Sequence, residues 1–81
     1  MSSYPTVITN NAIKKMKQYQ LSEAQVLDAF NFGEQSKSSL PQIAQYQALR
    51  KYSGYEIGVL YSQDNTTGQY FIVSCWSRPR R

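Results

Sequence analysis

Apolar residues near the amino end of the chain recur at helical spacing. Thr9 precedes them, and its hydroxyl suits an N-cap because it can accept a hydrogen bond from an unpaired backbone N–H. We therefore expect a first helix that begins after Thr9, with residues 1–7 as a short lead-in. Four apolar side chains lie on one face of that helix: Ala12, Ile13, Met16 and Tyr19.

A second helix has stronger end signals. Ser22 is followed three residues later by Gln25, the pattern of a capping box in which each side chain bonds the backbone N–H of the other residue. Gly33 is a typical C-terminal stop. Only a residue or two around Gln20 and Leu21 separates the two helices, so we expect a tight helical hairpin or corner.

The rest of the chain has strand-like patterns. Residues 34–42 are polar and irregular, which predicts a loop, and Pro41 restricts any strand inside it to a sheet edge. Residues 55–62 alternate strictly, with apolar or aromatic side chains at every second position. Residues 70–76 are apolar on both faces, which is typical of a strand near the centre of a sheet.

The dipeptide Ser53-Gly54 predicts a compact hairpin between the alternating strand and the segment before it, residues 43–52. A two-residue loop places Lys51 opposite Glu56, which is a favourable cross-strand pair. A longer loop shifts this register, and the sequence is compatible with both.

Together these elements predict an α+β fold in the order α-α-β-β-β, as a single domain over residues 1–81. Two N-terminal helices are expected on one face of a three- to four-stranded antiparallel sheet, because a sheet buries an apolar face against another layer. The other face is expected to be partly apolar and aromatic, since the last strand carries large side chains on both sides. Aromatic residues on such a face can stack on nucleic-acid bases.

Composition narrows the chemistry that this fold can carry. The chain has no histidine, which excludes histidine acid–base catalysis and histidine-ligated metals. Its one cysteine, Cys75, lies in the most apolar strand, so we expect a buried thiol rather than a nucleophile. We expect neither a metal nor a cofactor, because no ligand cluster or phosphate-binding glycine loop is evident. The chain has no apolar run of membrane-spanning length and no signal-peptide pattern, so we expect a cytoplasmic protein.

Basic and aromatic residues interleave along the predicted sheet. Nine Lys and Arg against five Asp and Glu give a formal net charge of +4. Cations neutralise phosphates and aromatic rings stack on bases, so this composition is typical of an RNA-binding surface. An ordinary solvated surface has the same composition, because RNA binding requires these residues to cluster in space.

The segments Ile8–Met16 and Leu21–Val26 resemble the opening of a bacterial family known as the domain of unknown function 4258. Its members begin with Ser/Thr-x-His-Ala-x-x-Arg-Met, continue with a short helix that opens with Ser and acidic residues, and end in a Val/Ile-rich strand, here Ile72–Trp76. The resemblance implies a fold similar to the RelE and ParE toxins and to barnase-type ribonucleases. It also implies RNA cleavage or a ribosome-linked activity.

Two positions depart from this family pattern. Asn11 stands where the family has its histidine, and Lys15 where it has its arginine. An amide has no acid–base function near neutral pH, while lysine keeps the charge without the planar fork of arginine. The resemblance therefore implies a scaffold that keeps phosphate-binding charge without the family's acid–base group. The candidate nucleic-acid contacts are Asn11, Lys14, Lys15, Arg50, Lys51, Tyr52, Trp76, Arg78 and Arg80.

Three functions fit these observations. The first is an RNA-binding or toxin-like domain with weak or lost nuclease activity. The second is a protein-interaction module that binds an antitoxin-like peptide or forms a homodimer through an open sheet edge. The third is a metal-independent ribonuclease that uses Lys, Arg, Tyr or Glu in place of histidine. Convergence of Lys15, Arg50 and Arg78 on one concave aromatic face would favour the first, whereas side chains that point in different directions would indicate ordinary solvated charge.

Overall fold

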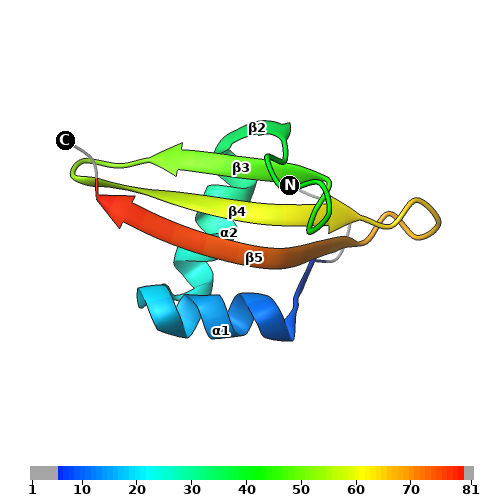
Figure 1. Cartoon of the computed structure of the whole chain (residues 1–81), viewed down its shortest axis with the longest axis horizontal. Helices are drawn as coiled ribbons and strands as arrows, with labels where there is room; N and C mark the ends of the chain where they lie inside the picture. Colours follow the sequence, from blue (N-terminus) through cyan, green and yellow to red (C-terminus); the bar gives the residue numbers. More distant parts are fainter. Residues whose placement is uncertain (1–5, 80–81) are drawn as a thin grey trace.

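The structure, a computed structural model, describes residues 6–79 and contains two helices and a five-stranded sheet (Figure 1). The predicted α+β class is confirmed. The strands lie in the order β1-β5-β4-β3-β2, so β4 is in the middle. The elements in chain order are β1 (Thr6–Ile8), α1 (Asn10–Tyr19), α2 (Glu23–Phe32), β2 (Glu34–Lys37), β3 (Tyr46–Lys51), β4 (Tyr55–Gln63) and β5 (Tyr70–Pro79).

The sheet has more strands than the three or four predicted, and it is mixed rather than purely antiparallel. The segment expected as a lead-in contains β1, so a strand precedes the helices. It pairs in parallel with β5 and aligns Ile8 with Ile72. The Thr9 N–H extends this pairing by donating to the Ile72 carbonyl at 3.1 Å. A strand of three residues is too short to show a two-residue period, so hydrophobic patterning does not mark it.

The polar segment after α2 contains the short edge strand that the sequence allowed. This strand, β2, pairs antiparallel with β3 and aligns Glu34 with Leu49. All four of its residues are exposed, and it lies at the outer edge of the sheet. Because β2 is polar on both faces, its sequence has no alternation from which its bounds follow.

Both helices begin at the predicted caps. The Thr9 hydroxyl accepts from the Ala12 N–H at 3.3 Å. Ser22 and Gln25 form the capping box, with hydrogen bonds of 2.8 and 3.2 Å. Gln20, with a φ of 58°, ends α1 in the left-handed region, and the chain then turns a corner into α2 (Figure 1).

Gly33 ends α2 for a steric reason rather than a conformational one. Its φ of −73° is open to any residue. A Cβ at this position would lie 2.4 Å from the Ala29 carbonyl oxygen and 3.0 Å from the carbonyl carbon of Leu49. Glycine therefore allows the end of α2 to lie directly against β3.

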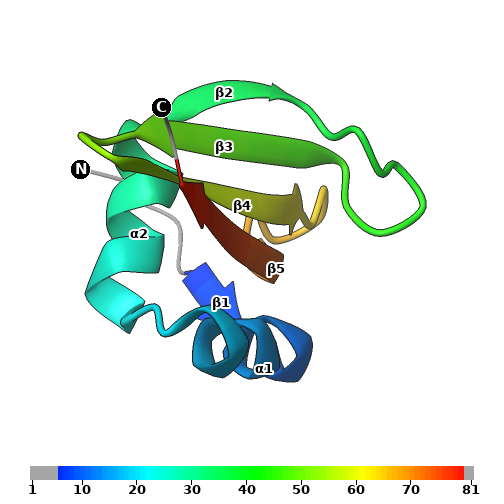
Figure 2. The same cartoon turned by 60° about the vertical axis from the view of Figure 1, so that its left-hand side comes forward.

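The core lies between the helices and one face of the sheet. α1 packs on β5, and α2 packs across β3 and β4 (Figure 2). The helices bury small residues at these contacts, Ala12 and Ala29, which lets their backbones approach the strands closely. Ile57 and Val59 of β4 are fully buried, so the predicted alternation directs the odd-numbered residues of β4 inward.

The β3–β4 hairpin has the shorter of the two loops considered. Lys51 aligns with Glu56, and the Tyr52 N–H donates to the Tyr55 carbonyl at 2.8 Å, which leaves a two-residue loop. Gly54 has a φ of 89°, a conformation that favours glycine. The ion pair of Glu56 is formed with Arg78 on the neighbouring strand β5, at 2.6 Å between Nε and Oε1.

A β-bulge interrupts the pairing of β4 with β5. Leu60 aligns with Ser74 and Tyr61 with Ile72, so Val73 is an extra residue on β5. The backbone carbonyl of Val73 accepts hydrogen bonds from the side chains of α1 and its cap, as described below. The bulge therefore ties α1 to the middle of β5.

Candidate functional site

A cleft of about 380 Å³ lies along α1, on the side of the sheet that faces away from α2. The register shows this placement, because Trp76 aligns with Gly58, whose neighbours Ile57 and Val59 point into the core. Leu40 and Ile43, from the loop between β2 and β3, form the opposite wall. The residues used below are Asn11, Lys15, Tyr19, Leu40, Ile43 and Trp76.

Trp76 is held against the sheet by the absence of a side chain at Gly58. A Cβ on Gly58 would lie 2.2, 2.3 and 2.6 Å from three atoms of the indole ring. The ring therefore lies directly over the β4 backbone, in space that any other residue would fill. This seat fixes Trp76 as part of the floor of the cleft.

The guanidinium of Arg78 lies over this ring. Its guanidinium carbon is 5.0 Å from the Trp76 ring centroid, within the range of a cation–π contact. The Glu56 carboxylate, which is buried, orients the guanidinium through the 2.6 Å bond. Arg78 thus has a fixed position at the hairpin end of the open sheet face, with most of its side chain exposed.

Lys15 is the half-buried cation of the cleft. Within residues 6–79, no carboxylate lies at ion-pair distance from it. It faces Cys75, whose thiol is 1% exposed, as predicted for a buried cysteine. Burial raises the pKa of Cys75 to about 11, and the Lys15 charge opposes this rise. Cys75 is therefore a neutral thiol near pH 7.

Asn11 joins the cleft to the bulge in β5. Its Nδ2 donates to the Val73 carbonyl at 2.9 Å. The Thr9 hydroxyl lies 3.3 Å from the same oxygen and 2.8 Å from the Ile72 carbonyl oxygen. The amide of Asn11 is thus oriented by the backbone, which leaves its carbonyl oxygen for the cleft.

Arg50 and Tyr52, two of the predicted contacts, lie elsewhere. Both interact with Asp28 on α2: the Tyr52 hydroxyl donates at 2.6 Å, and the Arg50 Nε lies at 3.3 Å. Burial, followed by the hydrogen bond and the charge of Asp28, raises the pKa of Tyr52 to about 12. Arg50 aligns with Ile57 and so lies on the helix-facing side of the sheet. Lys15 and Arg78 therefore share the Trp76 side of the sheet, but Arg50 does not join them.

The other predicted contacts do not line the cleft. Lys14 is exposed on α1, and Lys51 is exposed at the hairpin end of β3. Arg80 lies outside the described residues. Of the predicted nucleic-acid contacts, Asn11, Lys15 and Trp76 therefore line the cleft.

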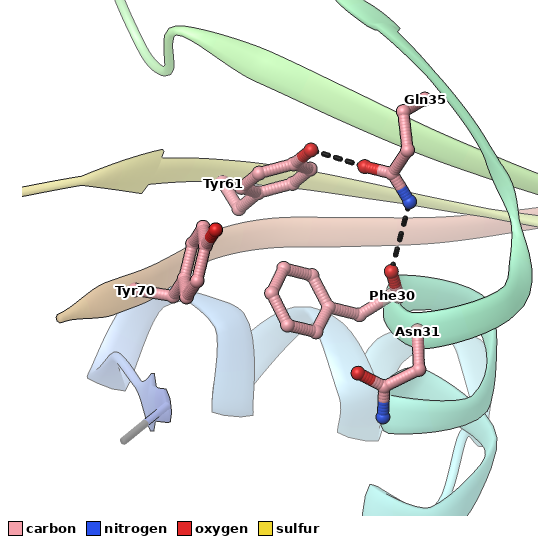
Figure 3. Close-up of a pocket in the computed structure, with 5 residues that line it drawn as sticks. All are labelled: Phe30, Asn31, Gln35, Tyr61 and Tyr70. Atoms are coloured by element: carbon pink, nitrogen blue, oxygen red, sulfur yellow. Dashed lines mark hydrogen bonds between the residues drawn. The ribbon is translucent and has the colours of Figure 1, made fainter. Parts of the chain in front are cut away.

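A second pocket, of about 320 Å³, lies on the helix-facing side and was not predicted (Figure 3). The Tyr61 hydroxyl donates to Gln35 Oε1, and Gln35 Nε2 donates to the carbonyls of Phe30 and Gly33 at 2.9 and 3.2 Å. Burial raises the pKa of Tyr61, so its phenol stays neutral. Phe30 also makes an edge contact with Tyr70, at 5.3 Å between centroids. The Gln35 amide and the three aromatic rings thus contact one another, so we interpret this pocket as part of the packing of α2 on the sheet and not as a binding site.

Sequence reasoning also missed the two apolar residues that form the outer wall of the cleft. Leu40 and Ile43 are 39% and 44% exposed, and they lie in a loop without periodic patterning. The available signal was their residue type. Two large apolar side chains close together in an otherwise polar segment can mark a binding groove or an interaction surface.

Comparison with protein family models, with curated proteins and with solved structures finds no match to this chain. The residues of the structure are therefore the basis for any functional proposal. Within residues 6–79, neither helix has the length and apolar character needed to cross a membrane.

Proposed function

We propose that this chain is a small RNA-binding domain of the RelE and ParE type whose nuclease activity is weak or lost. The observation that carries the proposal is Lys15, a half-buried cation without a described carboxylate partner, in one cleft with Trp76. A cation binds phosphate and an indole stacks on a base, so this pair fits the two parts of a nucleotide. The net charge of +4 adds a long-range attraction for RNA.

Two side chains that line the cleft, Asn11 and Cys75, support the second half of the proposal. Asn11 contributes an amide, which neither takes up nor releases a proton near neutral pH. Cys75 holds its proton because burial raises its pKa to about 11. RNA cleavage needs a base for the 2′-hydroxyl and an acid for the leaving oxygen, and neither side chain performs these steps efficiently at pH 7.

RNA binding is tested by the anisotropy of a labelled single-stranded RNA at increasing salt concentrations. Affinity should fall steeply with salt, because bound phosphates release counterions. Lys15→Ala should weaken binding and reduce the slope of log K against log salt by about 0.7, the value for one phosphate on a single strand.

Lys14→Ala is the matched control. It removes the same charge from the same helix, but Lys14 does not line the cleft. The Lys14 variant should therefore keep the wild-type salt slope. Equal effects of the two substitutions would show diffuse attraction to a basic protein and would contradict the proposal.

A nuclease assay separates this proposal from a histidine-free ribonuclease. Pure wild-type protein is incubated with labelled RNA in the presence of a chelator, and the products are resolved on a gel. We expect binding without appreciable cleavage. Rapid cleavage that Lys15→Ala abolishes would favour the ribonuclease instead.

A second candidate function, a protein interface, rests on the edge strand β2. The Ser38 N–H donates inward to the Gln45 carbonyl at 3.1 Å. Since inward and outward groups alternate in an antiparallel ladder, the backbone groups of Gln35 and Lys37 point toward the free edge. An extended peptide or a second copy could extend the sheet at this edge.

Strand addition at β2 is tested by light scattering and by titration with a partner peptide. Lys37→Pro removes an outward N–H, whereas Lys37→Ala removes only the side chain. Association through this edge should be lost in the proline variant and retained in the alanine variant. A protein that remains monomeric at high concentration would exclude self-association.

A further inference from the structure

We propose that the cleft recognises an unpaired nucleotide, with its base stacked on Trp76 and its phosphate against Lys15. This inference rests on the proposed RNA binding and specifies its ligand. Gly58 seats the indole ring directly against β4, because the position of its missing Cβ is within 2.6 Å of three ring atoms. An aromatic ring that is already fixed loses little side-chain entropy when a base stacks on it.

Arg78 adds a second planar group to the site. Its guanidinium lies 5.0 Å from the Trp76 centroid and is oriented by the buried Glu56. Guanidinium planes, like aromatic rings, stack on splayed bases. The ring and the guanidinium together form a stacking platform, with the cation of Lys15 at the α1 side.

The walls of the cleft favour single strands over duplexes. Duplex RNA is recognised through its shape and its phosphates, which requires several cations along a backbone. Among the residues that line this cleft, Lys15 is the cation, and Leu40, Ile43 and Tyr19 are exposed apolar or aromatic side chains. Such walls suit the faces of unstacked bases, which a duplex does not present.

Trp76 provides a direct readout, because it is the one tryptophan in the sequence. Its fluorescence is followed while the wild-type protein is titrated with oligouridylate, with oligothymidylate DNA and with a blunt RNA duplex. Both single strands should quench Trp76 fluorescence, and the duplex should not. Stronger quenching by the RNA strand would indicate an additional contact to the 2′-hydroxyl. Equal quenching by the two strands would indicate that the cleft contacts only the base and the phosphate.

Two substitutions test the platform by anisotropy with labelled oligouridylate. Trp76→Leu keeps an apolar side chain and should weaken binding roughly 5- to 150-fold, the range for loss of one base stack. Gly58→Ala keeps Trp76 but fills its seat, and should also weaken binding. Phe32→Leu is the control, because Phe32 is 72% exposed and lies outside the cleft. Circular dichroism and thermal unfolding establish that each variant is folded.

The outcomes distinguish this inference from the function on which it rests. RNA binding that depends on Lys15 but leaves Trp76 fluorescence unchanged would overturn the stacking inference and leave the proposed function standing. Equal quenching by the duplex would also overturn it. A protein that binds no RNA at low salt, while Lys14 and Lys15 variants behave alike, would overturn both.

Discussion

The amide nitrogen of Asn11 binds the backbone of β5, and the residue also lines the cleft. Its Nδ2 donates to the Val73 carbonyl at the bulge, and this hydrogen bond orients the amide. A histidine at this position has a matching arrangement, because one ring nitrogen can donate to the carbonyl while the other accepts a proton from a ligand. Substitution of Asn11 by histidine should therefore preserve the scaffold and change the chemistry.

If the cleft binds RNA as proposed, Asn11→His should confer RNA cleavage. A general base in this position contributes roughly 100-fold or more over the wild-type rate. The rate should rise with pH through about 6.5, where imidazole loses its proton. Gel assays on labelled RNA measure this, with Asn11→Gln as an amide control. Identical rates for the two variants would show that the cleft does not position RNA for cleavage.

Cys75 predicts a pH dependence of stability. Its pKa is raised from 9.0 to about 11 in the folded protein, so unfolding releases the thiol proton between these values. The free energy of unfolding should therefore be unaffected by this group below pH 9 and should decrease from pH 9 to 11, by an amount on the order of 2 kcal/mol. Urea unfolding at several pH values measures the decrease. Cys75→Ala should show a smaller one, whereas identical pH profiles would contradict the buried thiol.

At the scale of elements, the parts of the fold that follow from local interactions were predictable. Ser22 and Gln25 are three residues apart and close a capping box within one helical turn. The hairpin at Ser53 and Gly54 likewise depends on a few neighbouring residues, but the sequence was compatible with two loop lengths, and the structure has the shorter one. β1 was not predictable, because its three residues pair with a strand about sixty positions away and carry no period of their own.

The capping box should contribute measurably to stability. Ser22→Ala removes the acceptor for the Gln25 N–H and should lower the free energy of unfolding by about 1 kcal/mol. Ser53→Ala, at the exposed hairpin turn, should change it by less than about 0.5 kcal/mol. Urea unfolding monitored by circular dichroism compares the two. Equal small effects would mean that tertiary contacts alone hold α2 in place.

At the scale of the whole molecule, the helix-facing side of the sheet contributes to stability, and the opposite side carries the proposed binding cleft. Arg50 aligns with Ile57 and packs toward α2, whereas Trp76 aligns with Gly58 and faces away from it. Sequence reasoning grouped Arg50 with the cleft residues because charge clusters along a chain do not show which face each member occupies. The two-residue hairpin, combined with the burial of Ile57, would have placed Arg50 on the inner face.

Arg50→Ala should therefore affect stability, whereas Lys15→Ala should affect RNA binding. Loss of Arg50 removes its half-exposed pair with Asp28 and should lower stability by about 0.5–1 kcal/mol without changing RNA affinity. Loss of Lys15 should weaken RNA binding and leave stability nearly unchanged. Thermal unfolding and anisotropy measure both quantities in each variant. A drop in RNA affinity in the Arg50 variant, with the protein still folded, would extend the binding surface around the sheet edge.

The extra residue at Val73 shifts the alternation of inward and outward positions along β5. Ahead of it, even-numbered Ile72 lies on the core side; beyond it, odd-numbered Cys75 does so, and Trp76 is left on the outer side. Deletion of Val73 would join Ile72 directly to Ser74, and because these two residues already lie on opposite sides of the sheet, the rest of β5 would keep its present facing. The deletion would instead remove the carbonyl that accepts a hydrogen bond from Asn11. The extra residue is therefore expected to matter for the attachment of α1 and not for the placement of Ile72 and Trp76.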